Sequence, residues 1–139
     1  MEQQEHVELL RKSGLKVTPQ RLSVMNVIME AGEHFKAEEV YKKIKRTEPS
    51  ITLATVYNIF RSLNDNGIIN SFEVDGTTWF ESNLDAHANL FCEKCGTIED
   101  VSIPENSSLL EQFSLDGRKV RSASFVLKGL CARCSKNSK

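Results

Sequence analysis

Apolar residues recur every three to four positions from Val7 to Leu63, which is the spacing of one buried helix face. The pattern predicts four helices in this part of the chain. The second begins at Thr18-Pro19, because threonine caps a helix and proline suits its first turn. The residues predicted to be buried are, helix by helix, Val7, Leu9 and Leu10; Leu22, Met25, Ile28 and Met29; Val40, Tyr41 and Ile44; and Leu53, Val56, Phe60 and Leu63.

After the fourth helix the periodicity changes from helical to alternating. Gly67 ends the helix, and the sequence NSFEVDGTTWFE (70–81) then places Asp75-Gly76 between two alternating runs. This pattern predicts a β-hairpin, because Asp-Gly is favoured in two-residue hairpin turns. Three helices followed by such a hairpin form a winged helix-turn-helix. A small helical bundle whose polar face is merely solvated is the alternative that the pattern leaves open.

The predicted fourth helix carries small and hydrogen-bonding residues opposite its apolar stripe. Small residues let a helix backbone approach DNA, and polar residues reach base edges and phosphates in the major groove. Arg11, Lys12, Lys16 and Arg21 add local positive charge where phosphate contacts are expected. The residues predicted to contact DNA are Lys16, Thr18, Arg21, Thr52, Ala54, Thr55, Tyr57, Asn58 and Arg61.

The chain changes character after the hairpin, and the predicted domain boundary lies between Phe80 and Asp85. We expect residues 1–80 to form a winged-helix DNA-binding domain and residues 85–139 to form a small α/β dimerisation and metal-binding domain. The fold class expected for the whole chain is therefore α+β.

In the second domain the pattern predicts a strand through Ile98, Val101 and Ile103, a short helix from 107 to 113 and a strand from 120 to 127. Such a thin sandwich leaves one apolar face uncovered, so we expect a partner subunit to cover it. The helix residues predicted to be buried are Leu109, Leu110 and Phe113.

All four cysteines fall in two C-x2-C pairs, Cys92 with Cys95 and Cys131 with Cys134. Two thiolates at this spacing can reach one ion, and four sulfur ligands in a tetrahedron select zinc. Such a site has no open coordination position, so its expected role is structural, pinning the chain end onto the loop after the domain boundary. A redox pair, a disulfide framework and a zinc site that opens on oxidation are the alternatives.

Composition and charge exclude only a few classes of function. The chain has 139 residues and a formal net charge of −1, so any DNA site must be local. It contains no apolar run of membrane-span length, and its start, MEQQEHVELLRKSG, is too charged for a signal peptide. A cytoplasmic protein is expected, in which disulfides are disfavoured. The sequence carries no recognisable nucleophile–base pair, so an enzyme is not expected.

Several separated motifs resemble those of the ferric uptake regulator family. They are GLKVTPQR (14–21), HFKAEEVY (34–41), TLATVYNIFRSLNDNGII (52–69), CEKCGTIEDV (92–101) and the closing CARC (131–134). The resemblance runs from about residue 7 to the end. It implies a homodimeric, metal-dependent repressor that binds an inverted-repeat DNA operator, with a sensing metal between its two domains. It also implies that the family's structural zinc falls on the four cysteines.

Carried over residue by residue, the family's regulatory ligands fall on His34, Glu81, His87, Asn89 and Asp100. Oxygen and imidazole donors suit Fe(II) or Mn(II). One ion drawing these residues together would fix the angle between the domains, and with it the separation of the two recognition helices in a dimer. Metal binding would thereby be coupled to operator affinity.

Two residues resemble the peroxide-sensing branch of the family. They are Asp100, where many iron-uptake members carry glutamate, and Asn58, where arginine is common elsewhere. This likeness implies that Fe(II) reacts with hydrogen peroxide and oxidises a ligating histidine, His34 or His87, which frees the operator. Asn89 departs from the family, which usually has histidine there, and its neutral amide should lower metal affinity.

Three rival interpretations stay open at the level of the sequence. The nearest is an iron-, zinc- or manganese-uptake regulator of the same family that does not sense peroxide. A zinc-stapled protein-interaction module with no DNA role is the second, and an enzyme using the histidine and carboxylate site for hydrolysis is the third. His6 is a further imidazole that could replace the one missing at Asn89, although nothing in the sequence indicates it.

Overall fold

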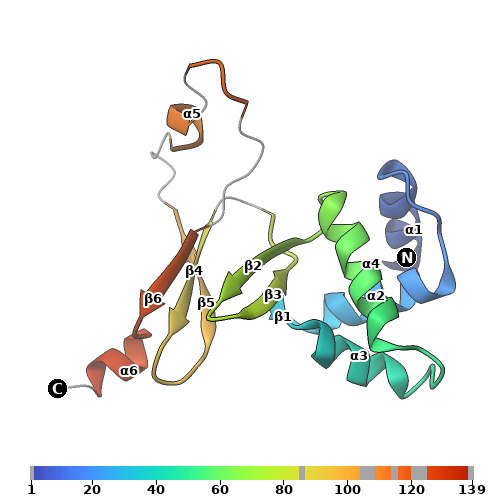
Figure 1. The fold of residues 1–139 in the computed structure, drawn as a ribbon, viewed down its shortest axis with the longest axis horizontal. Helices are drawn as coiled ribbons and strands as arrows, with labels where there is room; N and C mark the ends of the chain where they lie inside the picture. The colour runs from blue at the N-terminus through green and yellow to red at the C-terminus, as the bar shows by residue number, and fades with distance from the viewer. Residues whose placement is uncertain (1, 85–86, 104–108, 114–115, 120–124, 138–139) are drawn as a thin grey trace. The chain divides into compact units, whose positions relative to one another are not determined.

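The structure is a computed structural model, and it divides into two compact units, Met1–Leu84 and Asp85–Lys139 (Figure 1). Each unit is described by itself. The residues that the structure describes are 2–84, 87–103, 109–113, 116–119 and 125–137.

The first unit combines helices with a small antiparallel sheet. Its helices are α1 (Glu2–Lys12), α2 (Pro19–Glu30), α3 (Ala37–Lys45) and α4 (Leu53–Asp65). Its strands are β1 (His34–Phe35), β2 (Asn70–Val74) and β3 (Thr77–Glu81), in the spatial order β1-β3-β2. This is the winged helix-turn-helix that the sequence predicts, with β2 and β3 as the wing.

Local chemistry explains where these elements begin and end. Thr18 Oγ1 accepts a hydrogen bond from the Arg21 backbone N–H, which caps α2 at the predicted position. Thr52 Oγ1 caps α4 in the same way. The wing turns at Asp75 and Gly76 with φ angles of 50° and 82°, and two positive φ angles are what a type I′ turn requires.

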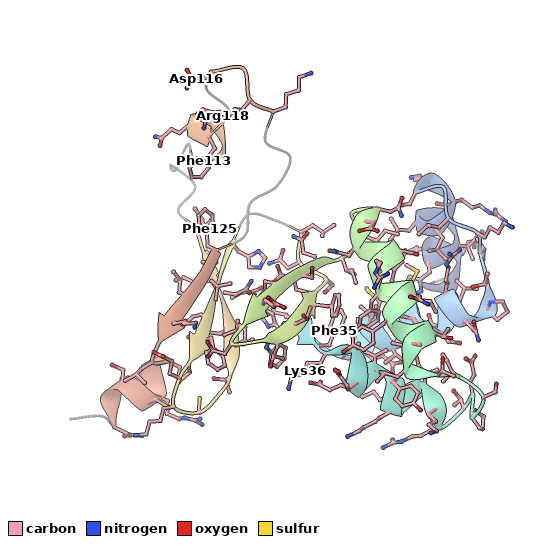
Figure 2. The ribbon with its side chains drawn as sticks, in the orientation of Figure 1. Phe35, Lys36, Phe113, Asp116, Arg118 and Phe125 are labelled. Carbon is pink, nitrogen blue, oxygen red and sulfur yellow. The ribbon has the colours of Figure 1, made fainter. Side chains whose placement is uncertain are left out.

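The core of the first unit joins the helices to the wing through three phenylalanines. Phe60 on α4 lies edge-on to Phe35 on β1 and Phe80 on β3, with ring centroids 5.7 and 4.6 Å apart. Phe35, labelled in Figure 2, is fully buried, and the sequence pattern gave no prediction for it. Its burial is what holds the two-residue strand β1 against β3.

Some predicted core positions of the first unit are wrong. Leu9 and Met29 are 41% and 66% exposed, and both line an apolar groove between helices, whereas Val24 and Ile59 are buried instead. Val7 is only half-buried, whereas Leu10 on the same helix is fully buried. Leu22 and Tyr41 are only partly buried against the core, and Leu53 is half-buried.

The second unit is built on a mixed three-stranded sheet. Its strands are β4 (His87–Cys92), β5 (Ile98–Ser102) and β6 (Phe125–Gly129), in the order β5-β4-β6. β4 runs antiparallel to β5 and parallel to β6. The short helices are α5 (Leu109–Phe113) and α6 (Ala132–Lys136).

The second unit also corrects the sequence prediction in places. Residues 87–92 form the central strand rather than a loop. Phe113 on α5, which Figure 2 labels, is 43% exposed rather than buried. The predicted strand from 120 to 127 is found at Phe125–Gly129; residues 120–124, and the side chains of Leu109 and Leu110, lie outside the described residues. Helices of the length and apolar character that a membrane span requires are absent from the described part of the chain.

Candidate functional site

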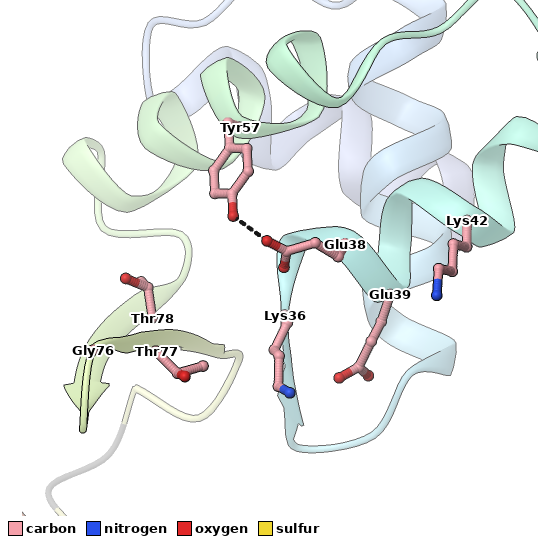
Figure 3. Close-up of a pocket in the computed structure, with 8 residues that line it drawn as sticks. All are labelled: Lys36, Glu38, Glu39, Lys42, Tyr57, Gly76, Thr77 and Thr78. Carbon is pink, nitrogen blue, oxygen red and sulfur yellow. Dashed lines mark hydrogen bonds between the residues drawn. The ribbon is translucent and has the colours of Figure 1, made fainter.

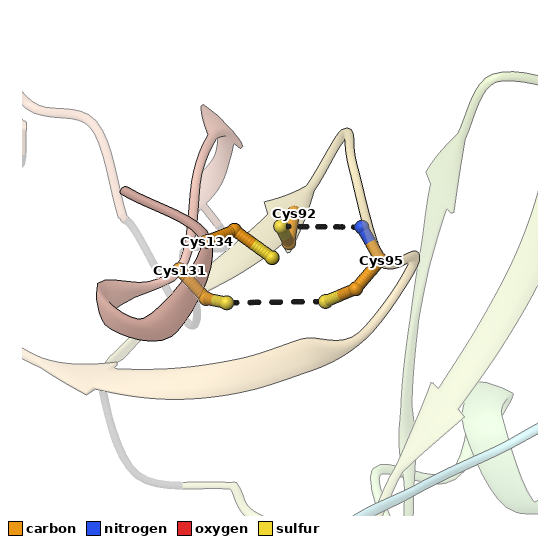
Figure 4. A group of neighbouring side chains, drawn as sticks. All are labelled: Cys92, Cys95, Cys131 and Cys134. Atoms are coloured by element: carbon orange, nitrogen blue, oxygen red, sulfur yellow. Dashed lines mark hydrogen bonds between the residues drawn. The ribbon is translucent and has the colours of Figure 1, made fainter. Parts of the chain in front are cut away.

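The four cysteines gather into one cluster in the second unit, as Figure 4 shows. Their Sγ atoms all lie within 4.8 Å of one another, and none of the four forms a disulfide. Cys95 Sγ and Cys131 Sγ are 3.8 Å apart. A tetrahedron of sulfurs bound about 2.3 Å from zinc has edges of about 3.8 Å. The four side chains therefore fit a zinc ion, and they fill all four of its positions.

Sheet pairing explains how two distant C-x2-C pairs meet. Cys92 ends β4 and is paired in register with Gly129 at the end of the parallel strand β6. The chain then turns back at Gly96, whose backbone N–H donates to the Cys92 carbonyl. Cys131 begins α6, which follows β6 directly. Parallel pairing of β4 with β6 thus places both cysteine pairs at one end of the sheet.

The thiols of this cluster favour binding to a cation. Backbone N–H groups, first that of Cys95 and then that of Cys131, lower the pKa of Cys92 to about 6. The adjoining sulfur of Cys131, followed by burial, raises the pKa of Cys134 to about 12. One thiolate is thus stabilised by the backbone, while a further negative charge beside it is disfavoured. A bound dication removes this conflict by holding all four sulfurs as thiolates.

One hydroxyl beside this cluster was not predicted from the sequence. Thr97 Oγ1 lies 3.0 Å from Cys95 Sγ, within hydrogen-bond distance. A hydrogen bond to a ligand from outside the metal's own shell orients that ligand. Position 97 follows the second C-x2-C cysteine by two residues, and that spacing is the sequence signal that could have pointed to it.

An imidazole–carboxylate pair lies on the sheet of the first unit. His34 on β1 is directly opposite Glu81 on β3, and His34 Nε2 is 3.7 Å from Glu81 Oε2. Glu81 is buried, and the His34 ring lies edge-on to Phe72. A buried carboxylate next to an imidazole supplies two donors that suit a divalent cation.

A second donor set lies on the sheet of the second unit. His87 and Asn89 occupy alternate positions on β4, so their side chains share one face of the sheet. Asn89 is directly opposite Asp100 on β5, and His87 Nε2 is 3.6 Å from Asp100 Oδ1. His87 and Asn89 are both buried. An imidazole, an amide oxygen and a carboxylate form a harder donor set than the four sulfurs.

His6 belongs neither to the His34–Glu81 pair nor to the donor set on the second sheet. Its buried ring lies in α1, and Nδ1 is 3.0 Å from Asn26 Oδ1 on α2. This hydrogen bond ties the first two helices together, so His6 has a structural partner of its own.

The residues predicted to contact DNA divide into two groups by their surroundings. Ala54, Tyr57, Asn58 and Arg61 follow one another at positions i, i+3, i+4 and i+7 of α4, and all four are exposed. They form one stripe along the helix. Thr55 next to this stripe is half-buried.

The other predicted contacts also have local structural roles. The Thr18 and Thr52 hydroxyls cap helices, and Arg21 Nη1 donates to the Lys16 carbonyl at 2.7 Å, which closes the loop before α2. Lys16 itself is exposed. Of this group, the Lys16 ammonium is the basic group presented most openly to a ligand.

Comparisons with known proteins agree on one family. The model of the "Ferric uptake regulator family" matches residues 12–127. The "Peroxide-responsive repressor PerR" of Staphylococcus epidermidis is 35% identical over 105 residues, which are 75% of this chain and 70% of that protein. A crystal structure of the Vibrio cholerae ferric uptake regulator (Fur) is 31% identical, with a TM-score of 0.68 over 90% of this chain and 98% of that one.

A further solved structure shares the fold and was determined with a metal. The ferric uptake regulator from Pseudomonas aeruginosa with manganese is 26% identical, with a TM-score of 0.72, and the match covers 91% of this chain and 98% of that one. The motifs quoted from the sequence and the winged helix-turn-helix of the first unit agree with this family. The chain belongs to the ferric uptake regulator family.

Proposed function

We propose that this chain is a homodimeric, metal-dependent DNA-binding transcriptional repressor that responds to hydrogen peroxide. The observation that carries the proposal is the presence of two chemically different donor sets, a closed cluster of four sulfurs and separate groups of imidazole and oxygen donors. The first suits a structural ion, and the second suits an ion that is sensed. The S. epidermidis relative, a peroxide-responsive repressor, supports the choice of signal.

The structural ion is zinc, held by Cys92, Cys95, Cys131 and Cys134. The distance between Cys95 Sγ and Cys131 Sγ matches a zinc tetrahedron. Because all four positions are filled by protein, this zinc offers no site to substrate or water. It ties the end of β4 to α6 and thereby stabilises the second unit.

The regulatory ion is Fe(II) or Mn(II), and its ligands come from His34, Glu81, His87, Asn89 and Asp100. The support for this set is that His34 pairs with Glu81 in one unit, while His87 pairs with Asp100 in the other. An ion that takes donors from both units would hold them at one angle. In a dimer that angle sets the distance between the two copies of α4, which half-site spacing on DNA selects.

DNA is the proposed partner, bound through the exposed stripe of α4. Ala54 lets the helix approach closely, and Asn58 and Arg61 supply hydrogen-bond donors. The dimer is supported by the second unit, where Val126, Leu127 and Leu130 are apolar yet exposed. A second copy covering β6 would remove these side chains from water.

Peroxide would act on the regulatory site. When bound, Fe(II) would supply the electron that cleaves the O–O bond of hydrogen peroxide. Overall, the imidazole of a ligating histidine would gain one oxygen atom from peroxide and lose two electrons, and the other oxygen would leave as water. His34 and His87 are the candidate histidines, since both lie beside a carboxylate that can share the ion. An oxidised imidazole is a poorer ligand, so the two units would no longer be held together and the operator would be released.

Elemental analysis combined with DNA binding tests this proposal. Protein purified without oxygen should contain one zinc per chain, retained on mild chelation, and a second ion that the chelator removes. Binding to an inverted-repeat duplex should require the second ion and should weaken steeply with salt. DNA binding that is equally tight without the second ion would remove the metal from the mechanism, and absence of DNA binding would favour a protein-interaction module.

A further inference from the structure

One hydrogen bond joins the exposed stripe of α4 to α3. The Tyr57 hydroxyl on α4 donates to Glu38 Oε1 in the first turn of α3. Figure 3 shows the phenol and the carboxylate pointing toward each other from the two helices. Tyr57 nevertheless stays 37% exposed, in the stripe that contains Asn58 and Arg61. Glu38 therefore contacts a side chain of the proposed DNA-binding face.

The proton of this hydrogen bond belongs to the tyrosine. The bond to Glu38 raises the pKa of the Tyr57 phenol, and the same bond lowers the pKa of the Glu38 carboxyl. At neutral pH the donor is thus a neutral phenol and the acceptor is an ionised carboxylate. Hydrogen bonds with an ionised partner are stronger than bonds between neutral groups. The phenol is held in place, and its single donor is already used.

A neighbouring glutamate provides a natural comparison. Glu38 and Glu39 both line the recess between α3, Tyr57 and the wing turn at Gly76-Thr77 (Figure 3). They are adjacent glutamates, and both are exposed. The Tyr57 hydroxyl is directed to Glu38. Comparing substitutions of Glu38 and Glu39 therefore separates two effects on DNA binding, that of removing a glutamate from this recess and that of removing the hydrogen bond to Tyr57.

We propose that Glu38 is a positioning residue that sets the sequence specificity of the DNA contact made by Tyr57. This inference rests on the proposed DNA-binding function. With its hydroxyl held by Glu38, Tyr57 presents its ring to the DNA, and a ring makes apolar contacts with base edges such as the thymine methyl. Without Glu38 the hydroxyl can turn and donate to any phosphate, and phosphate contacts carry no sequence information. Loss of Glu38 should therefore reduce discrimination between DNA sequences.

The test measures the affinity of the full-length, metal-loaded protein for two duplexes. One contains the inverted repeat that the wild-type protein selects from a random library, and the other is a scrambled duplex of the same composition. The quantity compared is the ratio of the two affinities. Glu38→Ala should lower this ratio about fivefold, the effect expected from loss of one hydrogen bond. Glu39→Ala should change both affinities equally and leave the ratio intact.

Two more variants test whether Glu38 acts through Tyr57. Glu38→Gln keeps an acceptor oxygen and should retain most of the ratio. With Tyr57→Phe already present, Glu38→Ala should change the ratio no more than Glu39→Ala does. Equal effects of the two alanine variants on the ratio, or an undiminished Glu38→Ala effect in the Tyr57→Phe background, would overturn the inference. A wild-type protein that binds both duplexes equally would also overturn the inference, whereas a wild-type protein that binds neither duplex would overturn the DNA-binding function as well.

Discussion

Replacing Cys134 with serine should unfold the second unit and leave the first unit folded. Cys134 is a suitable position because it is buried in α6 beside the other three sulfurs. In the described part of the second unit, the cluster of buried apolar side chains consists of Cys92, Cys131 and Cys134. The three sulfurs thus form a buried cluster in this described part, and a serine oxygen is a poor substitute for a thiolate as a zinc ligand.

The magnitude follows from the share of stability that the ion supplies. Structural zinc contributes about 10–16 kcal/mol of apparent binding free energy in zinc-finger peptides, whereas whole domains are stable by only about 5–15 kcal/mol. Losing one of the four zinc ligands should therefore cost more free energy than the free energy of unfolding of the second unit. The first unit has its own core around Phe35 and Phe60, so its free energy of unfolding should change little.

Hydrogen exchange followed by peptide mass spectrometry is the suitable assay, because it reports on each unit separately. Cys134→Ser should abolish amide protection in β4, β5 and β6 while α2 and α4 keep theirs, and zinc should be lost. Removing zinc from the wild type with a strong chelator should have the same effect. Lys94→Ala, an exposed position in the same turn as Cys95, is the matched control and should change nothing. Full protection of β4 in zinc-free protein would refute the structural role of the cluster.

Three other substitutions have defined outcomes. Arg61→Ala should weaken operator binding and lower the slope of log affinity against log salt by about one, because Arg61 is exposed on α4 and should contact phosphate in the proposed DNA complex; an unchanged slope would place Arg61 outside the interface. Asn89→His should raise affinity for Fe(II) or Mn(II) about tenfold without altering zinc content, as a metal titration followed by operator anisotropy would measure; equal titration curves would mean that position 89 is no ligand. Phe60→Ala should destabilise the first unit by about 3–5 kcal/mol in denaturant unfolding, since its ring is fully buried between two others; a loss below about 1 kcal/mol would contradict this core.

Features with local chemical causes could be predicted from the sequence. Thr18 caps a helix where expected, and the Asp75-Gly76 turn forms because both residues accept a positive φ. The four-sulfur cluster was predictable for a similar reason, since C-x2-C spacing by itself brings two thiolates to one ion.

Features that depend on tertiary contacts could not be predicted in this way. β1 has two residues, too few for any periodicity, and it exists because Phe35 is buried against Phe80 while β1 pairs with β3. β4 is buried through its first three residues, so it lacks the alternation that marks a half-exposed strand. Met29 has the right helical spacing for the core, yet it lines an open groove. The Tyr57–Glu38 hydrogen bond joins residues on separate helices, and no sequence spacing indicates it.

The candidate metal-sensing residues also combine a feature that the fold explains with one that sequence spacing alone does not reveal. Within each unit the sheet register explains the pairing, since His34 is directly opposite Glu81 and Asn89 is directly opposite Asp100. The identity of these residues as ligands came from the resemblance to the family, because a single histidine or carboxylate has no distinctive spacing.

The proposed sensing of peroxide through a regulatory Fe(II) ion is best tested by adding hydrogen peroxide to Fe(II)-loaded and Mn(II)-loaded protein. Both forms should bind the inverted-repeat duplex, and binding is followed by anisotropy while peroxide is added. Peroxide should release the Fe(II) form from DNA, with one added oxygen on the peptide containing His34 or His87, and should leave the Mn(II) form bound. Release of both forms alike, or retention of DNA by the Fe(II) form with both histidines intact, would contradict the proposed sensing.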